Sequence, residues 1–424
     1  MRAMLSRLTG LALLWSIGGG PVAAQQGLPA ATVQRAQHAV ARVSAQPPRF
    51  QAERYNPAVL HLRFTSAKGK TTSKRTDSFL DITLISPSGQ PEGVRAELSL
   101  SQFRDQLRQL YRQLSRQDDL NISDPQSPSR QLHDLLFGGI TPLLQREQIS
   151  TLLIAADRGL QAIPFAALSD GQAFFGERFA FSLTPSLALT DLGVSNPIGR
   201  RLLALGASEF EGLAALPLVP QELDQISVPA RKDSFLNKEF TPTRLIDLAG
   251  DPEYNQLHVA THAEFKPGGP AASQLHSGVG PMTMQQLTAL RQSRKGFPLD
   301  LVVFSACRTA LGDADAELGF SGLALQAGAK SAVGTLWYVD DVVTSAYFVQ
   351  MYRYLDQGVP KAEAMQMTRQ AFIRGIVRTD GNQVMGDGPE PLLTDLTTSQ
   401  RRRLINGVAN PFFWAGIELM GTPW

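Results

Sequence analysis

Two stretches of the chain decide its fold: residues 257–262 read LHVATH and residues 301–307 read LVVFSAC. Each is an apolar run that ends in a chemically reactive side chain, His262 in the first and Cys307 in the second. Short, fully apolar runs of this kind are typical of strands that are buried on both faces of a parallel sheet. Because the carboxyl ends of parallel strands meet at one edge of the sheet, we expect His262 and Cys307 to lie side by side.

Similar apolar runs recur along the chain and alternate with helical patterns. The other strands predicted in this region are residues 151–155, 202–206, 331–336 and 412–419, and the predicted helices are residues 220–226, 284–291, 319–327, 342–355 and 361–373. This alternation predicts an α/β fold with a doubly wound, mostly parallel sheet flanked by helices. A long polar loop is expected over residues 378–399.

The chain before residue 151 has a different pattern. Residues 60–64 and 79–85 alternate between apolar and polar, as in strands, and the turn SPSG at 86–89 indicates a hairpin. Apolar positions at helical spacing predict helices over residues 98–114 and 132–144, the second interrupted by Gly138 and Gly139. This part of the chain holds no Cys–His pair, so it is expected to support the fold.

The first 24 residues have the order of a secretory signal peptide. Arg2 and Arg7 precede an apolar run at residues 8–17, a Gly-Pro break follows, and small residues end the segment at Ala24. The run is shorter than the roughly 20 residues that span a bilayer. We therefore expect cleavage after Ala24, a secreted or periplasmic mature chain without a membrane anchor, and a linker over residues 25–55. An uncleaved anchor is the alternative.

Charge and residue types exclude several function classes. The chain has 40 basic and 38 acidic residues, and removal of Arg2 and Arg7 leaves 38 of each. A neutral mature chain argues against nucleic-acid partners. With one cysteine and no HExxH motif, the sequence indicates no metal site and no cofactor.

Cys307 is the chain's one cysteine, so it cannot form an internal disulfide bond. A thiol beside an imidazolium has a lowered pKa and becomes nucleophilic near neutral pH. His262 stands 45 residues before Cys307, close to the histidine-to-cysteine spacing of caspases. His258, four residues earlier on the same predicted strand, is interpreted as structural.

Several segments in a fixed order resemble the CHAT domain, the caspase- and separase-related cysteine peptidase module of clan CD. They are the two stretches above, RTALG at 308–312, GTLWYVDD at 334–341, NPFFWA at 410–415 and IPFAAL at 163–168. The resemblance covers roughly residues 60–421. It implies a smaller pseudo-caspase-like lobe at residues 56–197 and an active caspase-like lobe at residues 198–424, which together form the CHAT domain.

The resemblance also implies an exported cysteine endopeptidase that cleaves protein or peptide substrates through a His–Cys dyad. Cys307 would attack the scissile carbonyl, and His262 would accept the thiol proton and protonate the leaving amine. The backbone N–H groups of Ala263 and Cys307 would hold the oxyanion. Related enzymes have glycine where this chain has Ala263, and alanine still donates its N–H if its φ is negative. Glu264 and Asp313 are candidates for a third, orienting residue.

Asp340 and Asp341 follow the predicted strand at 331–336 and have two interpretations. In related peptidases this loop lines the pocket for the residue before the scissile bond, where a carboxylate would favour arginine or lysine. Alternatively, Asp340 caps the helix that begins near residue 342. If the preference for basic residues holds, residues 401–403, three arginines, are a candidate self-cleavage site.

Two other functions fit the same sequence. One is a catalytically inactive CHAT-fold module that binds or regulates a protein partner. The other is acyl or peptide ligation through the same thioester chemistry. The intact His262 and Cys307 favour the peptidase, for which a protein or peptide substrate and a regulatory protein are the expected partners.

Overall fold

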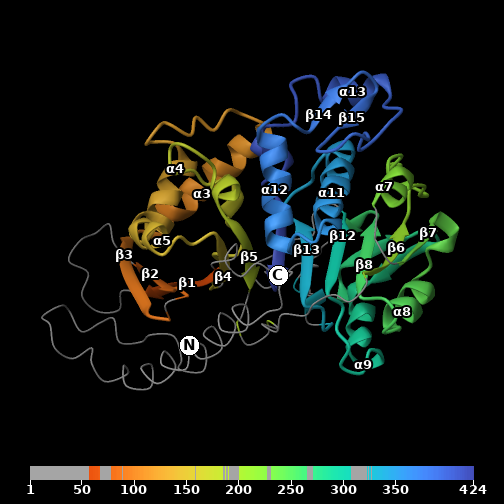
Figure 1. Ribbon diagram of the computed structural model, residues 1–424, viewed down its shortest axis with the longest axis horizontal. Helices are drawn as coiled ribbons and strands as arrows, with labels where there is room; N and C mark the ends of the chain where they lie inside the picture. Colours follow the sequence, from red (N-terminus) through yellow and green to blue (C-terminus); the bar gives the residue numbers. More distant parts are fainter. Residues whose placement is uncertain are drawn as a thin grey trace, which may run out of the picture.

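The structure is a computed structural model of the chain (Figure 1). It describes residues 57–66, 78–87, 89–157, 159–184, 187, 190, 200–226, 231–264, 271–306, 322, 324–325 and 327–424. The predicted signal peptide and linker, the lobe boundary at residue 197, most of the helix predicted over 319–327, Cys307 and Asp313 lie outside these ranges.

The described residues form one large sheet of eleven strands in the order β3-β2-β1-β4-β5-β16-β13-β12-β8-β6-β7. Its strands are β1 Pro57–Ser66, β2 Ser78–Ile85, β3 Pro91–Leu98, β4 Thr151–Ala156, β5 Ala180–Thr184, β6 Arg201–Gly206, β7 Arg231–Leu236, β8 Gln256–Ala260, β12 Leu301–Ser305, β13 Ser331–Thr335 and β16 Ile417–Gly421. Neighbouring strands are parallel except in the pairs β1–β2, β2–β3 and β13–β16. The predicted α/β fold with a mostly parallel sheet is therefore confirmed.

Helices cover the sheet on both faces (Figure 1). They are α3 Leu100–Arg116, α4 Pro128–His133, α5 Thr141–Arg146, α6 Phe175–Arg178, α7 Val219–Gln225, α8 Pro242–Gly250, α9 Leu290–Ser293, α11 Asp341–Asp356, α12 Lys361–Ile373 and α13 Thr398–Arg403. Successive side chains of β6 point to opposite faces of the sheet. Leu202 and Ala204 belong to the core that includes α7, α11 and α12, and Leu203 and Leu205 to the core that includes α8 and α9. This alternation explains why residues 202–205 of the strand are all apolar.

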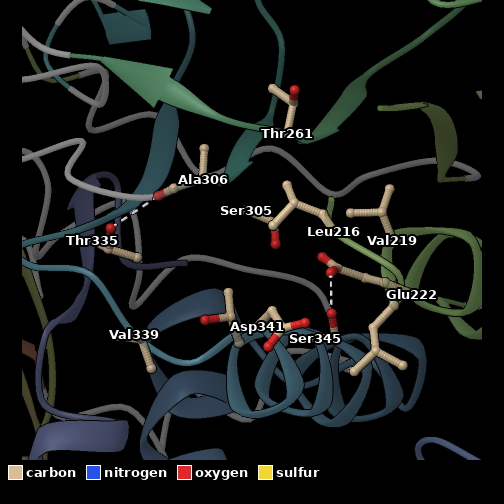
Figure 2. A pocket seen from close by; sticks show the side chains of 12 residues that line it. Leu216, Val219, Glu222, Thr261, Ser305, Ala306, Thr335, Val339, Asp341 and Ser345 are labelled. Carbon is tan, nitrogen blue, oxygen red and sulfur yellow. Dashed lines mark hydrogen bonds between the residues drawn. The ribbon is translucent and has the colours of Figure 1, made fainter. Parts of the chain in front are cut away.

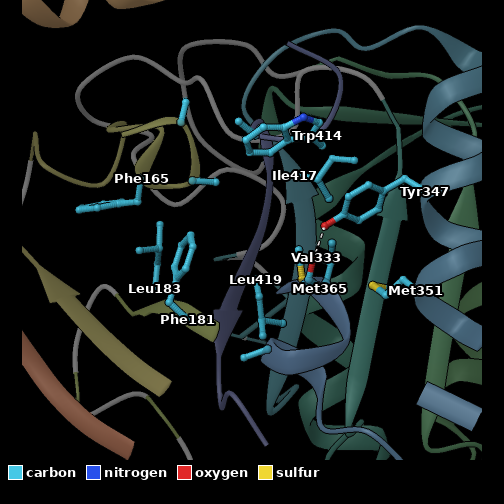
Figure 3. Close-up of a cluster of buried hydrophobic side chains, with 14 of the residues drawn as sticks. Phe165, Phe181, Leu183, Val333, Tyr347, Met351, Met365, Trp414, Ile417 and Leu419 are labelled. Atoms are coloured by element: carbon cyan, nitrogen blue, oxygen red, sulfur yellow. Dashed lines mark hydrogen bonds between the residues drawn. The ribbon is translucent and has the colours of Figure 1, made fainter. Parts of the chain in front are cut away.

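Both predicted lobes contribute to this one sheet, because the last strand of the chain, β16, lies between β5 and β13. The side chains around this junction form one buried cluster (Figure 3). Phe181 and Leu183 come from β5, Ile417 and Leu419 from β16, and Tyr347 from α11, and each is at most 1% exposed. The N-terminal and C-terminal parts of the chain therefore share a hydrophobic core.

Four elements differ from the prediction. The helical stretch over residues 132–144 is interrupted at Gly138 and Gly139 as predicted, but its first part is α4 followed by a π-helical turn at Asp134–Gly138, and α5 follows the break. Residues 284–291 form a 3-10 helix, Met284–Ala289, that continues into the short α9. The polar loop at 378–399 contains a hairpin of β14 Arg378–Asp380 and β15 Gln383–Met385.

The fourth difference lies at the end of the chain. Residues 412–419 do not form a single strand: Pro411–Phe413 is a 3-10 turn, and β16 begins at Ile417. Proline at the first position favours such a turn because its φ is fixed and it lacks an N–H. Trp414 is nevertheless fully buried, so the aromatic residues fill the core from a turn instead of a strand.

Candidate active site

The two stretches that decided the fold are neighbours in the sheet. β8 and β12 pair in parallel, with Ala260 opposite Ser305, and the Thr261 N–H donates to the Ser305 carbonyl at 3.1 Å. His262 follows Ala260 by two positions, and Cys307 follows Ser305 by two positions in the sequence. The register therefore brings the residues before His262 and the end of the described part of β12 to the same edge of the sheet, and the placement of Cys307 beside His262 stays a prediction.

The His262 imidazole is held by a main-chain carbonyl. Its Nε2 lies 2.7 Å from the carbonyl oxygen of Ala214, and the ring of Phe210 packs against it with centroids 4.7 Å apart. A carbonyl oxygen only accepts, so Nε2 carries the hydrogen and Nδ1 keeps its lone pair. The half-buried ring is therefore oriented as a base that acts through Nδ1.

Ala263 lies in a short strand, β9 Ala263–Glu264, which pairs with β10 Gln274–Ser277. The His276 N–H donates to the His262 carbonyl at 2.9 Å, which makes this pair the hydrogen-bonded one of the antiparallel ladder. The next pair, Ala263 with Leu275, is then the non-hydrogen-bonded one, so the Ala263 N–H points away from β10. Ala263 is not among the residues with positive φ, so alanine fits here without backbone strain.

A small pocket opens beyond the carboxyl ends of β8, β12 and β13 (Figure 2). The strand ends contribute Thr261, Ser305 and Ala306, and the Thr335 hydroxyl donates to the Ala306 carbonyl at 3.0 Å. The opposite wall comes from α7, the residues just before it and α11, and contains Leu216, Val219, Glu222, Asp341 and Ser345. Its free volume of about 30 Å³ has room for one or two water molecules.

Asp340 and Asp341 stand at the start of α11 and have different surroundings. Asp340 caps the helix, because its Oδ1 accepts from the Val342 N–H at 3.0 Å, and Asp341 lines the pocket. Arg403 of α13 donates to both, from Nε to Asp340 at 2.5 Å and from Nη2 to Asp341 at 2.6 Å. Burial raises the pKa of Asp341, and the Asp340 charge adds to this, against the opposing effect of Arg403.

A buried carboxylate connects the pocket walls. Glu222 of α7 accepts from the Ser345 hydroxyl of α11 at 2.6 Å and lies 2.9 Å from His258 Nε2 of β8. Glu222 and His258 are at most 1% exposed. His258 therefore fixes α7 and α11 over the strand that leads to His262, which agrees with its predicted structural role.

The comparison with known families supports the resemblance seen in the sequence. The model of the CHAT domain matches residues 126–422. The chain belongs to the CHAT domain family. No curated protein matches the chain.

Solved structures show what the CHAT chain is similar to in fold. A chain of the Saccharomyces cerevisiae separase–securin complex matches with a TM-score of 0.55 and 9% identity, over 93% of this chain and 31% of that one. The CHAT chain thus spans about a third of that chain's length. Gingipain R, an Arg-specific cysteine proteinase, matches with a TM-score of 0.43 and 11% identity over 68% of each chain. The fold is related to that of the caspase-like cysteine peptidases.

Within this CHAT domain, the described parts of the predicted site converge. His262 and Ala263 directly follow Thr261 at the carboxyl end of β8, and Asp341 lines the pocket that Thr261 also lines. Asp340 caps α11, and Cys307 lies outside the described residues. Residues 401–403, the candidate self-cleavage site, form the last turn of α13. In the part of the chain that the structure describes, every helix is too short or too polar to span a bilayer.

Sequence reasoning missed two groups of this site. The orienting partner of His262 was sought in the side chains of Glu264 and Asp313, whereas the structure places a main-chain carbonyl, that of Ala214, against the ring. Every residue carries such a carbonyl, so no sequence signal could have found it. Glu222 was also missed, because a single glutamate on a short helix is usually exposed.

Proposed function

We propose that this CHAT domain is a cysteine endopeptidase in which Cys307 is the nucleophile and His262 the general base. The observation that carries the proposal is the hydrogen bond from His262 Nε2 to the Ala214 carbonyl. It leaves Nδ1 as the proton acceptor, at the sheet edge where the strand that leads to Cys307 also ends.

The reaction would follow the usual thiol sequence. His262 Nδ1 accepts the Cys307 thiol proton, and the thiolate attacks the scissile carbonyl. The N–H groups of Ala263 and Cys307 hold the resulting oxyanion, and the Ala263 N–H is free of the β10 ladder for this purpose. The imidazolium then protonates the leaving amine. Water, activated by the same imidazole, hydrolyses the thioester.

We further propose that Asp341 favours a basic residue before the scissile bond. Its carboxylate lies in the pocket beside the strand ends, where a charge-assisted hydrogen bond would be strong. Substitution of Asp341 by Asn should lower kcat/KM for arginyl peptides by about 10- to 100-fold and leave leucyl peptides nearly unchanged, since a partly buried charge pair contributes about 1.5–3 kcal/mol. Equal losses for both peptides would contradict this assignment.

Export through the segment at residues 1–24 is part of the proposal, so the substrates would be proteins outside the cytoplasm. Expression of the full chain with a C-terminal tag, followed by N-terminal sequencing of the exported form, checks this. A mature chain that begins at Gln25 is the expected result, and a retained Met1 with membrane association would indicate an anchor.

Labelling of the thiol tests the catalytic assignment directly. Iodoacetamide should alkylate wild-type Cys307 at neutral pH, and His262→Ala should slow the reaction by about 10²-fold or more because the base that generates the thiolate is lost. His61→Gln, in β1 at a distant part of the sheet, serves as the histidine control and should label like wild type. Equal rates for wild type and His262→Ala would instead favour the catalytically inactive binding module.

A further inference from the structure

The acidic pair at the start of α11 is already bound to a cation of the same chain. Arg403, at the end of α13, donates to Asp340 and Asp341 through separate nitrogens, so one guanidinium binds both carboxylates. Hydrogen bonds between a guanidinium and carboxylates are among the strongest that side chains form. A substrate arginine that binds Asp341 would compete with Arg403 for this carboxylate.

The pocket that the described residues form beside the pair is narrow in this state. Its free volume of about 30 Å³ is too small for an arginine or lysine side chain. Asp341, Thr344 and Ser345 form one wall of this pocket, and all three belong to α11, whose first turn Arg403 holds. A basic side chain that binds Asp341 would therefore meet Arg403 at the same carboxylate.

We infer that Arg403 is an internal competitor for the basic substrate residue, and that substrate binding exchanges the Arg403 guanidinium for that of the substrate at Asp341. This inference rests on the proposed function, in which Asp341 binds the residue before the scissile bond. A substrate must then bind Asp341 more favourably than Arg403 does.

The geometry favours an exchangeable contact over a permanent one. The Arg403 side chain is 44% exposed, whereas those of Asp340 and Asp341 are 14% and 19% exposed. Ion pairs with an exposed partner contribute little to stability, so the arginine can leave without unfolding the domain. Burial and the Asp340 charge raise the pKa of Asp341, so this carboxylate stays ionised most easily when a cation is bound to it.

Removal of the competitor should strengthen binding of basic ligands. The matched variants are Arg403→Gln and Arg402→Gln, since Arg402 is the exposed neighbour in the same helix and its loss changes the net charge equally. An arginyl acyloxymethyl ketone should label Arg403→Gln about two- to tenfold faster than wild type, in proportion to the freed fraction of the site. A norleucyl ketone and iodoacetamide should label both at the same rate, and Arg402→Gln should behave like wild type.

Two failures remain distinguishable. If iodoacetamide labels wild type above the His262→Ala background but the arginyl ketone gains nothing from Arg403→Gln, the competition is wrong and the peptidase assignment stands. If iodoacetamide shows no such activation, the peptidase assignment fails. The competition between Arg403 and a basic ligand is then tested by a binding measurement that needs no catalysis.

Binding of benzamidine in the His262→Ala background measures the exchange without chemistry. Calorimetry should give a dissociation constant two- to tenfold lower when Arg403→Gln is added, and no change when Arg402→Gln is added. Equal constants in all three proteins would overturn the competition. A fall in thermal stability of Arg403→Gln without any gain in affinity would show instead that the contact only fastens α13 to α11.

Discussion

At the scale of single residues, the site depends on where protons are held. The Ala214 carbonyl fixes the His262 tautomer, and the Glu222 carboxylate holds His258 and Ser345. Neither arrangement needs an unusual residue, only a buried or half-buried geometry that makes each hydrogen bond obligatory. A third carboxyl, that of Glu418 in β16, is buried, and its Oε1 has no hydrogen-bond partner among the described residues.

Glu418 makes stability depend on pH. Burial raises the pKa of Glu418 well above its ordinary value, although Arg369 opposes the shift. The folded state therefore binds a proton more tightly than the unfolded state, so stability is highest below the unfolded pKa and falls as pH rises toward the folded pKa. Glu418→Gln removes this dependence.

The unfolding free energy of Glu418→Gln should gain on wild type by about 1.4 kcal/mol per pH unit above pH 4.5, until the folded pKa is passed. Denaturant titrations between pH 5 and pH 8 measure this difference. Glu239→Gln, at an exposed position, provides the control and should show no trend. A difference between Glu418→Gln and wild type that stays constant with pH would contradict the assignment.

At the scale of elements, the strand pair β8–β12 positions the site, and this could be predicted. Both strands are mostly apolar and are followed by a reactive residue, so their burial and their shared edge could be predicted from residues 257–262 and 301–307. The edge strand β7 was not predicted, because its exposed and half-buried residues give no apolar run. The turn at Pro411–Phe413 was missed because an aromatic run fits a strand as well as a buried turn.

This turn is held by a close contact that only glycine permits. A Cβ at Gly416 would lie 2.6 Å from the Trp337 ring, and the Trp337 Nε1–H donates to the Phe412 carbonyl at 2.9 Å, so the ring cannot easily move. Gly416→Ala should therefore destabilise the protein by about 1–3 kcal/mol through overpacking. Denaturant unfolding measures the loss.

Gly93→Ala is the matched control, because a Cβ there meets only ordinary contacts at 3.7 Å or more. In a double-mutant cycle, Trp337→Leu should relieve most of the cost of Gly416→Ala, since the smaller side chain leaves room for the methyl group. Additive losses in that cycle would show that the ring contact is not the cause.

At the scale of the whole molecule, the sequence indicated two lobes and the structure joins them through the final strand. Among the described residues, the direct contact consists of one registered pair between β16 and β5, Met420 opposite Leu183, and a hydrogen bond from the Ser182 hydroxyl to the Gly421 carbonyl at 2.8 Å. Local patterns cannot predict this closure, because it joins residues more than 200 positions apart. The coupling between the lobes must therefore come mainly from shared side-chain packing.

That packing predicts that both parts of the chain unfold together. Leu60 in β1 belongs to the core that extends to α11 and α12, and Leu245 in α8 belongs to the core on the other face of the same sheet. Each is fully buried, so substitution of either by Ala should lower the free energy of unfolding by about 2–5 kcal/mol.

Hydrogen exchange along a denaturant titration, read from peptides of residues 78–98 and 231–250, reports each part separately. Both peptides should shift to the same lower midpoint in either variant, because a continuous sheet transmits the loss. If Leu245→Ala moved only the peptide at 231–250, the two lobes would be independent folding units, and the shared β16 would be a contact between finished domains.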